Sequence, residues 1–157
     1  DRNINTQIWT KREIGMLKAY SIRNRIFEIA GIEINSVARV LEKRNIAKFI
    51  SPPLDSFVVD AFDNSKSRRL LKDLCSTTCT SCLHIGFSGD YGEIIWNEDY
   101  RVPDDKGEDD CDYPLARNLI ILLTGIASEV IVRFAVSGEK KNYTVTLGDF
   151  KVEEYHQ

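Results

Sequence analysis

The sequence has few of the residues and patterns that mark common enzyme classes. Its 157 residues include only two histidines, His84 and His156. It contains neither a glycine-rich phosphate loop nor a dinucleotide-binding fingerprint. The near match to a nucleophile elbow at residues 86–89 lacks the second glycine, because Asp90 stands in that place. These absences favour a non-enzymatic protein and leave an enzyme as the third alternative.

Long hydrophobic runs are also absent. The best candidate for a membrane span, residues 119–127, has about half of the roughly 18 uncharged apolar residues that a span needs. The N-terminus is polar, so no signal peptide is expected. An intracellular location is therefore expected, in the cytoplasm or nucleus, and a secreted one only if the cysteines are disulfide-bonded.

Glycine and proline are too scarce for a collagen-like or low-complexity chain. The sequence has nine glycines and four prolines, with 43% hydrophobic and 29% charged residues. This composition is that of an ordinary globular protein. A chain of this length can bury a core without disulfides or metals, so we expect one domain, or a domain with a small appendage.

Charge of each sign is concentrated in a different part of the chain. The net charge is −3. Residues 1–50 hold ten basic and five acidic residues, whereas the remainder holds eleven basic and nineteen acidic residues. A basic first third joined to an acidic remainder favours an anionic partner such as a nucleic acid. The alternative is two solvated faces that attract each other.

Residues 1–53 are predicted to form a basic helical region of two or three short helices. Thr10 and Glu13 have the spacing of a capping box, which predicts a helix beginning at Lys11. Gly31 is a natural helix end. A further helix is expected from residue 36 to residue 50, because one face of this stretch is mostly apolar and the two prolines at 52–53 terminate it.

Within this region, residues 25–50 resemble a helix–turn–helix of the winged family. An apolar helix ending in Ile-Ala-Gly is followed by a short turn and a capped helix. The resemblance implies a nucleic-acid interface in which the second helix enters the major groove. The residues that it places against bases or phosphates are Asn35, Ser36, Arg39 and Lys43, with Arg44 and Lys48 near the backbone. The alternative is a small helical bundle packed on a sheet.

Residues 54–157 are predicted to form an antiparallel sheet of two hairpins with one buried helix, in the order ββαββ. A loosely alternating strand at 56–62 and a helix beginning near Ser65 come first. Alternation predicts a strand at 83–87, and the Gly-Asp-Tyr-Gly turn after it predicts a partner strand at 93–98 in a hairpin. A helix at 115–127 is followed by strands at 129–137 and 143–150. The expected fold class is therefore α+β, and this part is expected to pack as one domain with the helical region.

The cysteines leave three interpretations open. Cys79 and Cys82 have the spacing of a zinc knuckle, which Cys75, His84 or Cys111 could complete, so zinc is the one metal considered. An even number of cysteines and the glycosylation sequon at Asn142 would instead suit disulfides. The third interpretation is a helix face of buried free thiols that continues from Leu71.

A binding module is the function that these observations favour. The leading hypothesis is a nucleic-acid-binding regulatory or accessory protein that uses the basic N-terminal helices. The rival is a protein–protein interaction domain of viral, immune or scaffold type with no nucleic-acid role. The acidic run at residues 104–112 lacks the alternate-residue spacing of a calcium loop and is interpreted as solvated. No catalytic residue, no organic cofactor and no oligomeric state is predicted.

Overall fold

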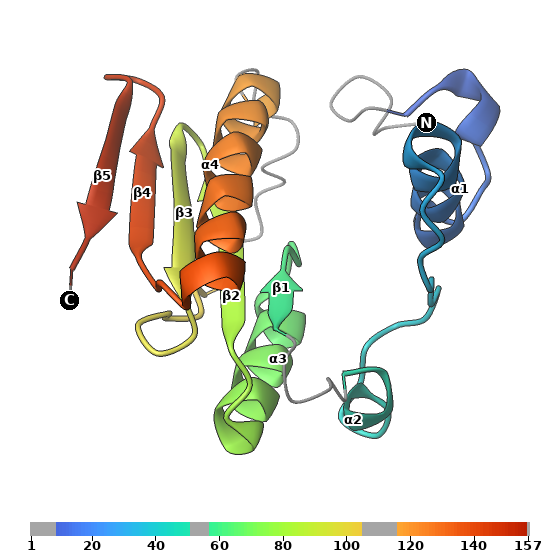
Figure 1. The fold of residues 1–157 in the computed structure, drawn as a ribbon, viewed down its shortest axis with the longest axis horizontal. Helices are drawn as coiled ribbons and strands as arrows, with labels where there is room; N and C mark the ends of the chain where they lie inside the picture. Colours follow the sequence, from blue (N-terminus) through green and yellow to red (C-terminus); the bar gives the residue numbers. More distant parts are fainter. Residues whose placement is uncertain (1–8, 51–56, 105–115, 157) are drawn as a thin grey trace. The chain divides into compact units, whose positions relative to one another are not determined.

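The computed structural model describes residues 9–50, 57–104 and 116–156 of the chain (Figure 1). These residues fall into two compact units, residues 1–41 and residues 42–157. The first unit is helical and irregular, and the second contains a five-stranded sheet with helices.

The first unit contains the short 3-10 turn η2 (Lys11–Glu13) and the helix α1 (Lys18–Ala30). The Thr10 N–H donates to the Glu13 carboxylate at 2.7 Å, as the capping box predicted, but the turn ends after three residues. Glu13 also forms an ion pair with Arg25 of α1 at 2.6 Å. Gly31 ends α1 in the left-handed conformation, with φ 68°, which confirms the predicted helix end.

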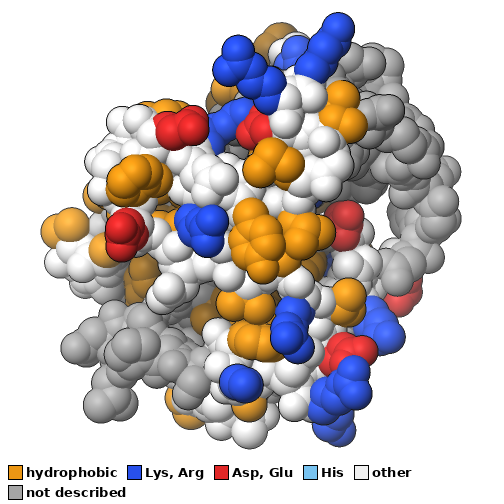
Figure 2. Space-filling model, turned by 90° about the vertical axis from the view of Figure 1, so that its right-hand side faces the viewer, with side chains coloured by type: hydrophobic (Ala, Val, Ile, Leu, Met, Phe, Trp, Pro, Cys, Tyr) orange, Lys and Arg blue, Asp and Glu red, His pale blue; other side chains and the backbone are white. Residues whose placement is uncertain are grey.

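Large apolar side chains remain exposed on this unit. Ser21 is the one described residue of α1 that is buried, whereas the side chains of Phe27 and Ile29 are 54% and 80% exposed. Figure 2 shows hydrophobic side chains at the surface beside Lys and Arg side chains. The exposed apolar residues of the unit are Ile14, Met16, Leu17, Tyr20, Ile22, Phe27, Ile29, Ile32, Val37 and Val40. Apolar surface of this extent is typical of a surface that another structure covers.

The second unit is built on a mixed sheet in the order β1-β2-β3-β4-β5. Its strands are β1 (Val58–Asp60), β2 (Cys82–Ser88), β3 (Tyr91–Trp96), β4 (Asn142–Thr146) and β5 (Lys151–Tyr155). β1 and β2 are parallel, and the helix α3 (Ser65–Thr78) connects them. The remaining neighbours pair antiparallel. The short helix α2 (Ile46–Phe49) packs against α3.

Two glycines show that α3 and α4 (Ala116–Ser137) lie on opposite faces of this sheet. A Cβ atom on Gly86 of β2 would lie 3.1 Å from the Arg68 guanidinium of α3. A Cβ atom on Gly92 of β3 would lie 2.9 Å from a methyl group of Leu123 of α4. Because Gly92 pairs with Phe87, the neighbour of Gly86, the two glycines face opposite sides. The second unit therefore has three layers, with a helix on each face of the sheet.

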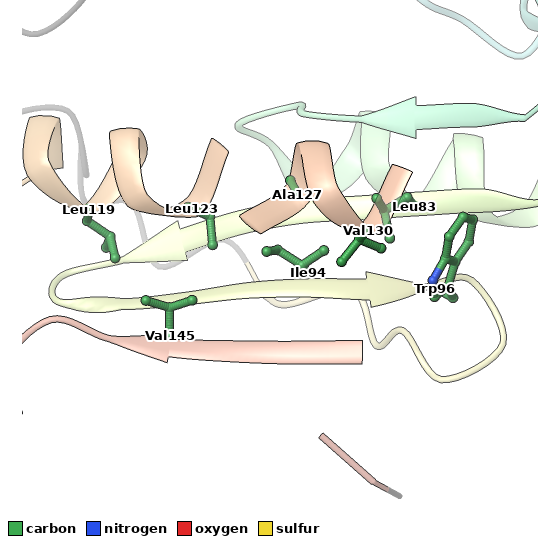
Figure 3. Packing of buried hydrophobic residues seen from close by; sticks show 8 residues of the cluster. All are labelled: Leu83, Ile94, Trp96, Leu119, Leu123, Ala127, Val130 and Val145. Carbon is green, nitrogen blue, oxygen red and sulfur yellow. The ribbon is translucent and has the colours of Figure 1, made fainter. Parts of the chain in front are cut away.

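The hydrophobic core lies between α4 and the sheet (Figure 3). Four residues at helical spacing on α4 point toward β2, β3 and β4 and are almost completely buried. The core residues are Leu83, Ile94, Trp96, Leu119, Leu123, Ala127, Val130 and Val145. The α4 face of the sheet is thus apolar, and polar groups are left to the opposite face.

The predicted α+β fold with a ββαββ sheet of two hairpins is wrong, because β1 adds a fifth strand that is parallel to β2 and the sheet carries a helix on each face. The apolar segment 129–137 was also assigned to the wrong element. Its β-branched residues favoured a strand, but the segment continues α4 to Ser137 because its residues extend the apolar face of that helix. The fourth strand in chain order is therefore β4, which overlaps the strand predicted at 143–150, and the fifth strand is β5. The strand β5 was missed because its sequence, Lys-Val-Glu-Glu-Tyr, is charged and mostly exposed at the sheet edge.

The expected helix at residues 36–50 is also wrong. Residues 31–44 are irregular in the structure, and the α-helix covers only Ile46–Phe49. The Asn45 side-chain oxygen accepts a hydrogen bond from the Glu42 N–H at 2.8 Å. This local bond favours a turn in place of a continuous helix.

The helix α4 is longer than the helix predicted at 115–127, and its length bears on the question of a membrane span. Residues 117–137 are long and apolar enough to cross a membrane by length and composition alone, whereas residues 119–127 were judged too short. In the structure one side of α4 packs on the sheet and the other exposes Ile121, Val132 and Val136. The side of α4 that faces the sheet is apolar because its residues form part of the hydrophobic core.

Candidate functional site

Polar and charged side chains are buried between α3 and its face of the sheet. Asp60 of β1 and His84 of β2 are fully buried, and Arg68 of α3 is 8% exposed. Buried charged groups are rare and are kept only when they are paired. This buried polar cluster is completed by Asn97 and Tyr100, both of which follow β3.

Asp60 connects β1 to the next strand and to the following turn. The register of the parallel pair places Asp60 beside His84, and its Oδ2 atom lies 2.7 Å from His84 Nδ1. Its Oδ1 atom accepts a hydrogen bond from the Phe62 N–H at 2.9 Å. The carboxylate therefore positions the imidazole ring and holds the chain as it leaves β1.

His84 is restrained on both edges and on one face. Its Nε2 atom lies 2.8 Å from Asn97 Oδ1, and the Tyr100 ring stacks on the imidazole at 3.9 Å between centroids. Asn97 is fixed in turn, because its Nδ2 donates to Ser76 Oγ at 2.8 Å and its backbone carbonyl accepts from Lys72 Nζ at 2.8 Å. The ring is thus a positioned element between α3 and the sheet.

Arg68 brings a positive charge into the same cluster. Its guanidinium donates to Tyr100 Oη at 3.0 Å and to the Ile85 carbonyl at 2.9 Å, and it lies 3.9 Å from Asp60 Oδ2. Glycine at position 86 gives this guanidinium its space. The buried carboxylate of Asp60 therefore faces both Arg68 and His84, so the charges in the cluster are compensated.

Glu93 of β3 adds a second carboxyl group on this face, opposite Gly86 in the register. Burial raises the pKa of Glu93 above its usual value, although the charges of Arg68 and His84 act in the opposite direction. A carboxyl group whose pKa is higher in the folded chain favours folding below its unfolded pKa and loses this contribution as the pH rises through its folded pKa.

We therefore expect Glu93→Gln to stabilise the protein at pH 7. The amide removes a carboxylate that burial disfavours, and we expect a rise in Tm on the order of 2 °C. The advantage should shrink as the pH falls through the raised pKa of Glu93 in the folded chain, and it should vanish once the pH is below the ordinary value of about 4.5. Thermal unfolding followed by circular dichroism across pH 4–8 measures this difference, and a gap that widens toward low pH would contradict the assignment.

The turn after β1 offers exposed polar groups next to the cluster. Asn64 caps α3 by accepting from the Ser67 N–H at 2.8 Å, and its Nδ2 donates to Asp63 Oδ1 at 3.2 Å. The Asp63 side chain is exposed. This turn lies at the carboxyl end of a strand in a parallel pair, which is the position where open α/β sheets bind ligands.

The residues predicted to contact nucleic acid do not lie along one helix. Asn35, Ser36 and Arg39 belong to the irregular segment of the first unit. Lys43 and Arg44 lie in a loop and turn of the second unit, where Arg44 pairs with Glu42 at 2.6 Å, and Lys48 lies on α2. The helix that should have presented them together is missing from the described residues.

The residues considered as zinc ligands do not form a metal site in the described part of the chain. Cys75 and Cys82 are buried free thiols, Cys79 is an exposed one, and His84 is held by Asp60 and Asn97. Cys111 lies outside the described residues. Within the described ranges no three His, Cys, Asp or Glu side chains are grouped so that they could hold a metal ion. Asn142 of the sequon is 8% exposed, and its side chain bonds the Trp96 N–H and Asp99.

Asp60, Arg68, Asn97 and Tyr100 were not identified from the sequence. The available signal was the alternation of β2, which puts His84 and Gly86 on the side opposite to Leu83 and Ile85. A histidine and a glycine on the inner face of a buried strand indicate a polar neighbour. The sequence could not show that α3 returns the chain to a parallel strand and so brings Arg68 to that face.

A parallel βαβ unit, a mixed sheet covered by helices on both faces and polar residues at the carboxyl end of β1 define an α/β protein of Rossmann type. The chain belongs to the ThiF family, whose model matches residues 2–140. No individual curated protein matches the sequence.

Solved structures share this fold at low sequence identity. Escherichia coli MccB with MccA-N7isoASN is similar with a TM-score of 0.75 and 12% identity over 99% of this chain and 54% of MccB. E. coli MccB with ATP has a TM-score of 0.69 and 12% identity over 95% of this chain and 50% of MccB. The protein PaaA has a TM-score of 0.69 and 11% identity over 98% of this chain and 60% of PaaA. The chain thus spans half to three-fifths of these proteins.

These comparisons correct the functional prediction. The ThiF match runs through residues 25–50, so the resemblance of that stretch to a helix–turn–helix was misleading and the nucleic-acid-binding hypothesis is wrong. The basic residues of the first third are therefore no sign of a nucleic-acid partner. Some of the MccB structures contain MccA.

Proposed function

We propose that this chain is part of an ATP-using enzyme that activates a carboxyl group of a peptide or protein as an acyl adenylate. The observation that carries the proposal is membership of the ThiF family over residues 2–140. The fold similarity adds support, because MccB was solved with ATP and with AMPCPP together with MccA.

The proposed reaction is a nucleotidyl transfer. A carboxylate oxygen of the peptide attacks the α-phosphorus of ATP, and the bond from that phosphorus to the bridging oxygen breaks. The products are the acyl adenylate and pyrophosphate. The carboxyl carbon of the peptide is then bonded through oxygen to AMP, a good leaving group that a nucleophile can displace.

The turn that follows β1 is the part of the described chain best placed for the nucleotide. Asp63 is exposed there, and it can accept hydrogen bonds from nucleotide hydroxyl groups, as carboxylates do in Rossmann-type folds. The buried polar cluster restrains this turn, because the Phe62 N–H donates a hydrogen bond to the Asp60 carboxylate. Because the chain has no glycine-rich phosphate loop, we assign it a share of the nucleotide site only.

The test is ATP binding, with Asp63→Ala as the variant and Asp73→Ala as its matched control. Both side chains are exposed, but Asp73 lies on α3 away from its first turn. Loss of a hydrogen bond to a charged acceptor should weaken binding about tenfold to hundredfold for Asp63→Ala. Asp73→Ala should bind as the wild type does. Titration with a fluorescent ATP analogue measures both affinities.

Two results would overturn the proposal at different points. Equal affinities for the two variants would remove Asp63 from the nucleotide site. An absence of any ATP binding, together with an absence of peptide-dependent exchange of pyrophosphate into ATP, would remove the adenylation activity from this chain.

A further inference from the structure

Three cysteines surround the junction between α3 and β2. Cys75 lies in the last turn of α3 and Cys82 is the first residue of β2, and their exposures are 1% and 0%. Cys79 lies between them at the helix end in the left-handed conformation, with φ 54°, and is exposed. The reversal at Cys79 returns the chain from the helix to the sheet. It thereby brings Cys75 and Cys82 together, although six residues separate them.

The two buried thiols face the same interface, because Cys82 alternates along β2 with His84 and Gly86, and Cys75 lies four residues after the buried Leu71 on α3. A side-chain hydrogen bond from the Cys82 thiol lowers the pKa of Cys75, and the same bond raises the pKa of Cys82. The negative charge of Asp60 raises the pKa of both thiols, which shows that they adjoin the buried polar cluster. Cys75 is therefore the sulfur that ionises first, with the Cys82 thiol beside it as a second reactant.

We propose that Cys75 and Cys82 form an oxidation site, in which hydrogen peroxide converts the two thiols into an intramolecular disulfide. The Cys75 thiolate attacks one peroxide oxygen, the O–O bond breaks, and the released hydroxide takes up a proton to become water. The resulting sulfenic acid is then attacked by the Cys82 sulfur, which expels a second hydroxide. The thiols lose two electrons and two protons, and one peroxide becomes two waters.

Backbone hydrogen bonds fix the chain on both sides of the junction. The Thr80 N–H donates to the Cys75 carbonyl at 2.9 Å, and the Val58 N–H of β1 donates to the Ser81 carbonyl at 2.9 Å. The helix end and the start of β2 are thus fixed before any bond forms. Ser76, next to Cys75, contacts Asn97 of the buried polar cluster, so the disulfide would tie the end of α3 to that cluster.

The experiment uses the full chain with Cys79→Ser, Cys111→Ser and Met16→Leu, so that Cys75 and Cys82 are the remaining thiols and the exposed Met16 cannot take up oxygen. After treatment with hydrogen peroxide, we expect the intact mass to fall by about 2 Da and both thiols to resist alkylation in denaturant until a reductant is added. The reduced chain should bind one phenylarsine oxide, a reagent that requires two adjacent thiols. Adding Cys82→Ala should abolish both results.

A gain of 16 or 32 Da, a covalent dimer, or two thiols that remain alkylatable would overturn the proposal. The wild-type chain gives an assay that does not depend on how the variants fold. After oxidation and proteolysis, the peptides that contain Cys75 and Cys82 should be found joined. A disulfide that joins either residue to Cys79 or Cys111 instead would also contradict the site.

Discussion

Asp60→Ala is expected to lower the free energy of unfolding by about 3–5 kcal/mol, because it removes one partner from a buried set of charges. The Asp60 carboxylate is fully buried between His84 at 2.7 Å and Arg68 at 3.9 Å. Without it, the positive charge of Arg68 stays buried and His84 Nδ1 loses its partner. The Phe62 N–H also loses its acceptor in the turn after β1.

Two further variants separate the charge from the hydrogen bonds. Asp60→Asn keeps an oxygen acceptor and the side-chain shape, so its cost should lie between that of the wild type and that of Asp60→Ala. Asp63→Ala, in the same turn but exposed, should change stability by less than about 0.5 kcal/mol. Urea unfolding followed by circular dichroism gives the three free energies. A cost for Asp60→Ala no larger than that for Asp63→Ala would show that the buried polar cluster does not stabilise the fold.

Local signals predicted the elements that do not depend on distant neighbours. Alternation located β2, and the turn that follows it located the hairpin partner β3. The polar residues before Ser65 located the start of α3, where Asn64 is the cap. The parallel pairing of β1 with β2 could not be predicted, because it depends on α3 covering the sheet and not on a turn sequence. The predicted sheet of two hairpins therefore lacked β1 and its parallel pairing with β2.

The candidate site also depends on contacts between distant residues, which local signals did not predict. His84 attracted notice only as one of several ligands for zinc, and Asp60 was hidden in a loosely alternating strand. Their pairing is a property of the parallel register. Arg68 reaches Asp60 from α3, and Asn97 reaches the His84 ring from the segment after β3. Residues separated by 24 and 13 positions meet only once the sheet is assembled, and no local spacing encodes that meeting.

The β-branched residues of the segment 129–137 led to the prediction of a strand where the structure has a helix. Substitutions of Val132 test which of the two elements the segment forms. Val132 lies inside α4 and is 54% exposed, so its side chain contributes little to the core. Val132→Pro should cost about 3 kcal/mol or more, because proline removes a helical hydrogen bond and its ring clashes with the carbonyl of residue 128. The loss is large because α4 supplies half of the core that covers the sheet.

Val132→Ala gives the opposite sign for a helix and for a strand. In a helix, alanine is the better former, so the variant should be more stable than the wild type by about 0.5 kcal/mol. In a strand, replacing valine by alanine should destabilise the protein by up to about 1 kcal/mol. Urea unfolding of the two variants beside the wild type decides between them. A destabilised alanine variant with a tolerated proline would restore the strand at residues 129–137, whereas a stabilised alanine variant with a disrupted proline variant supports a continuous helix to Ser137.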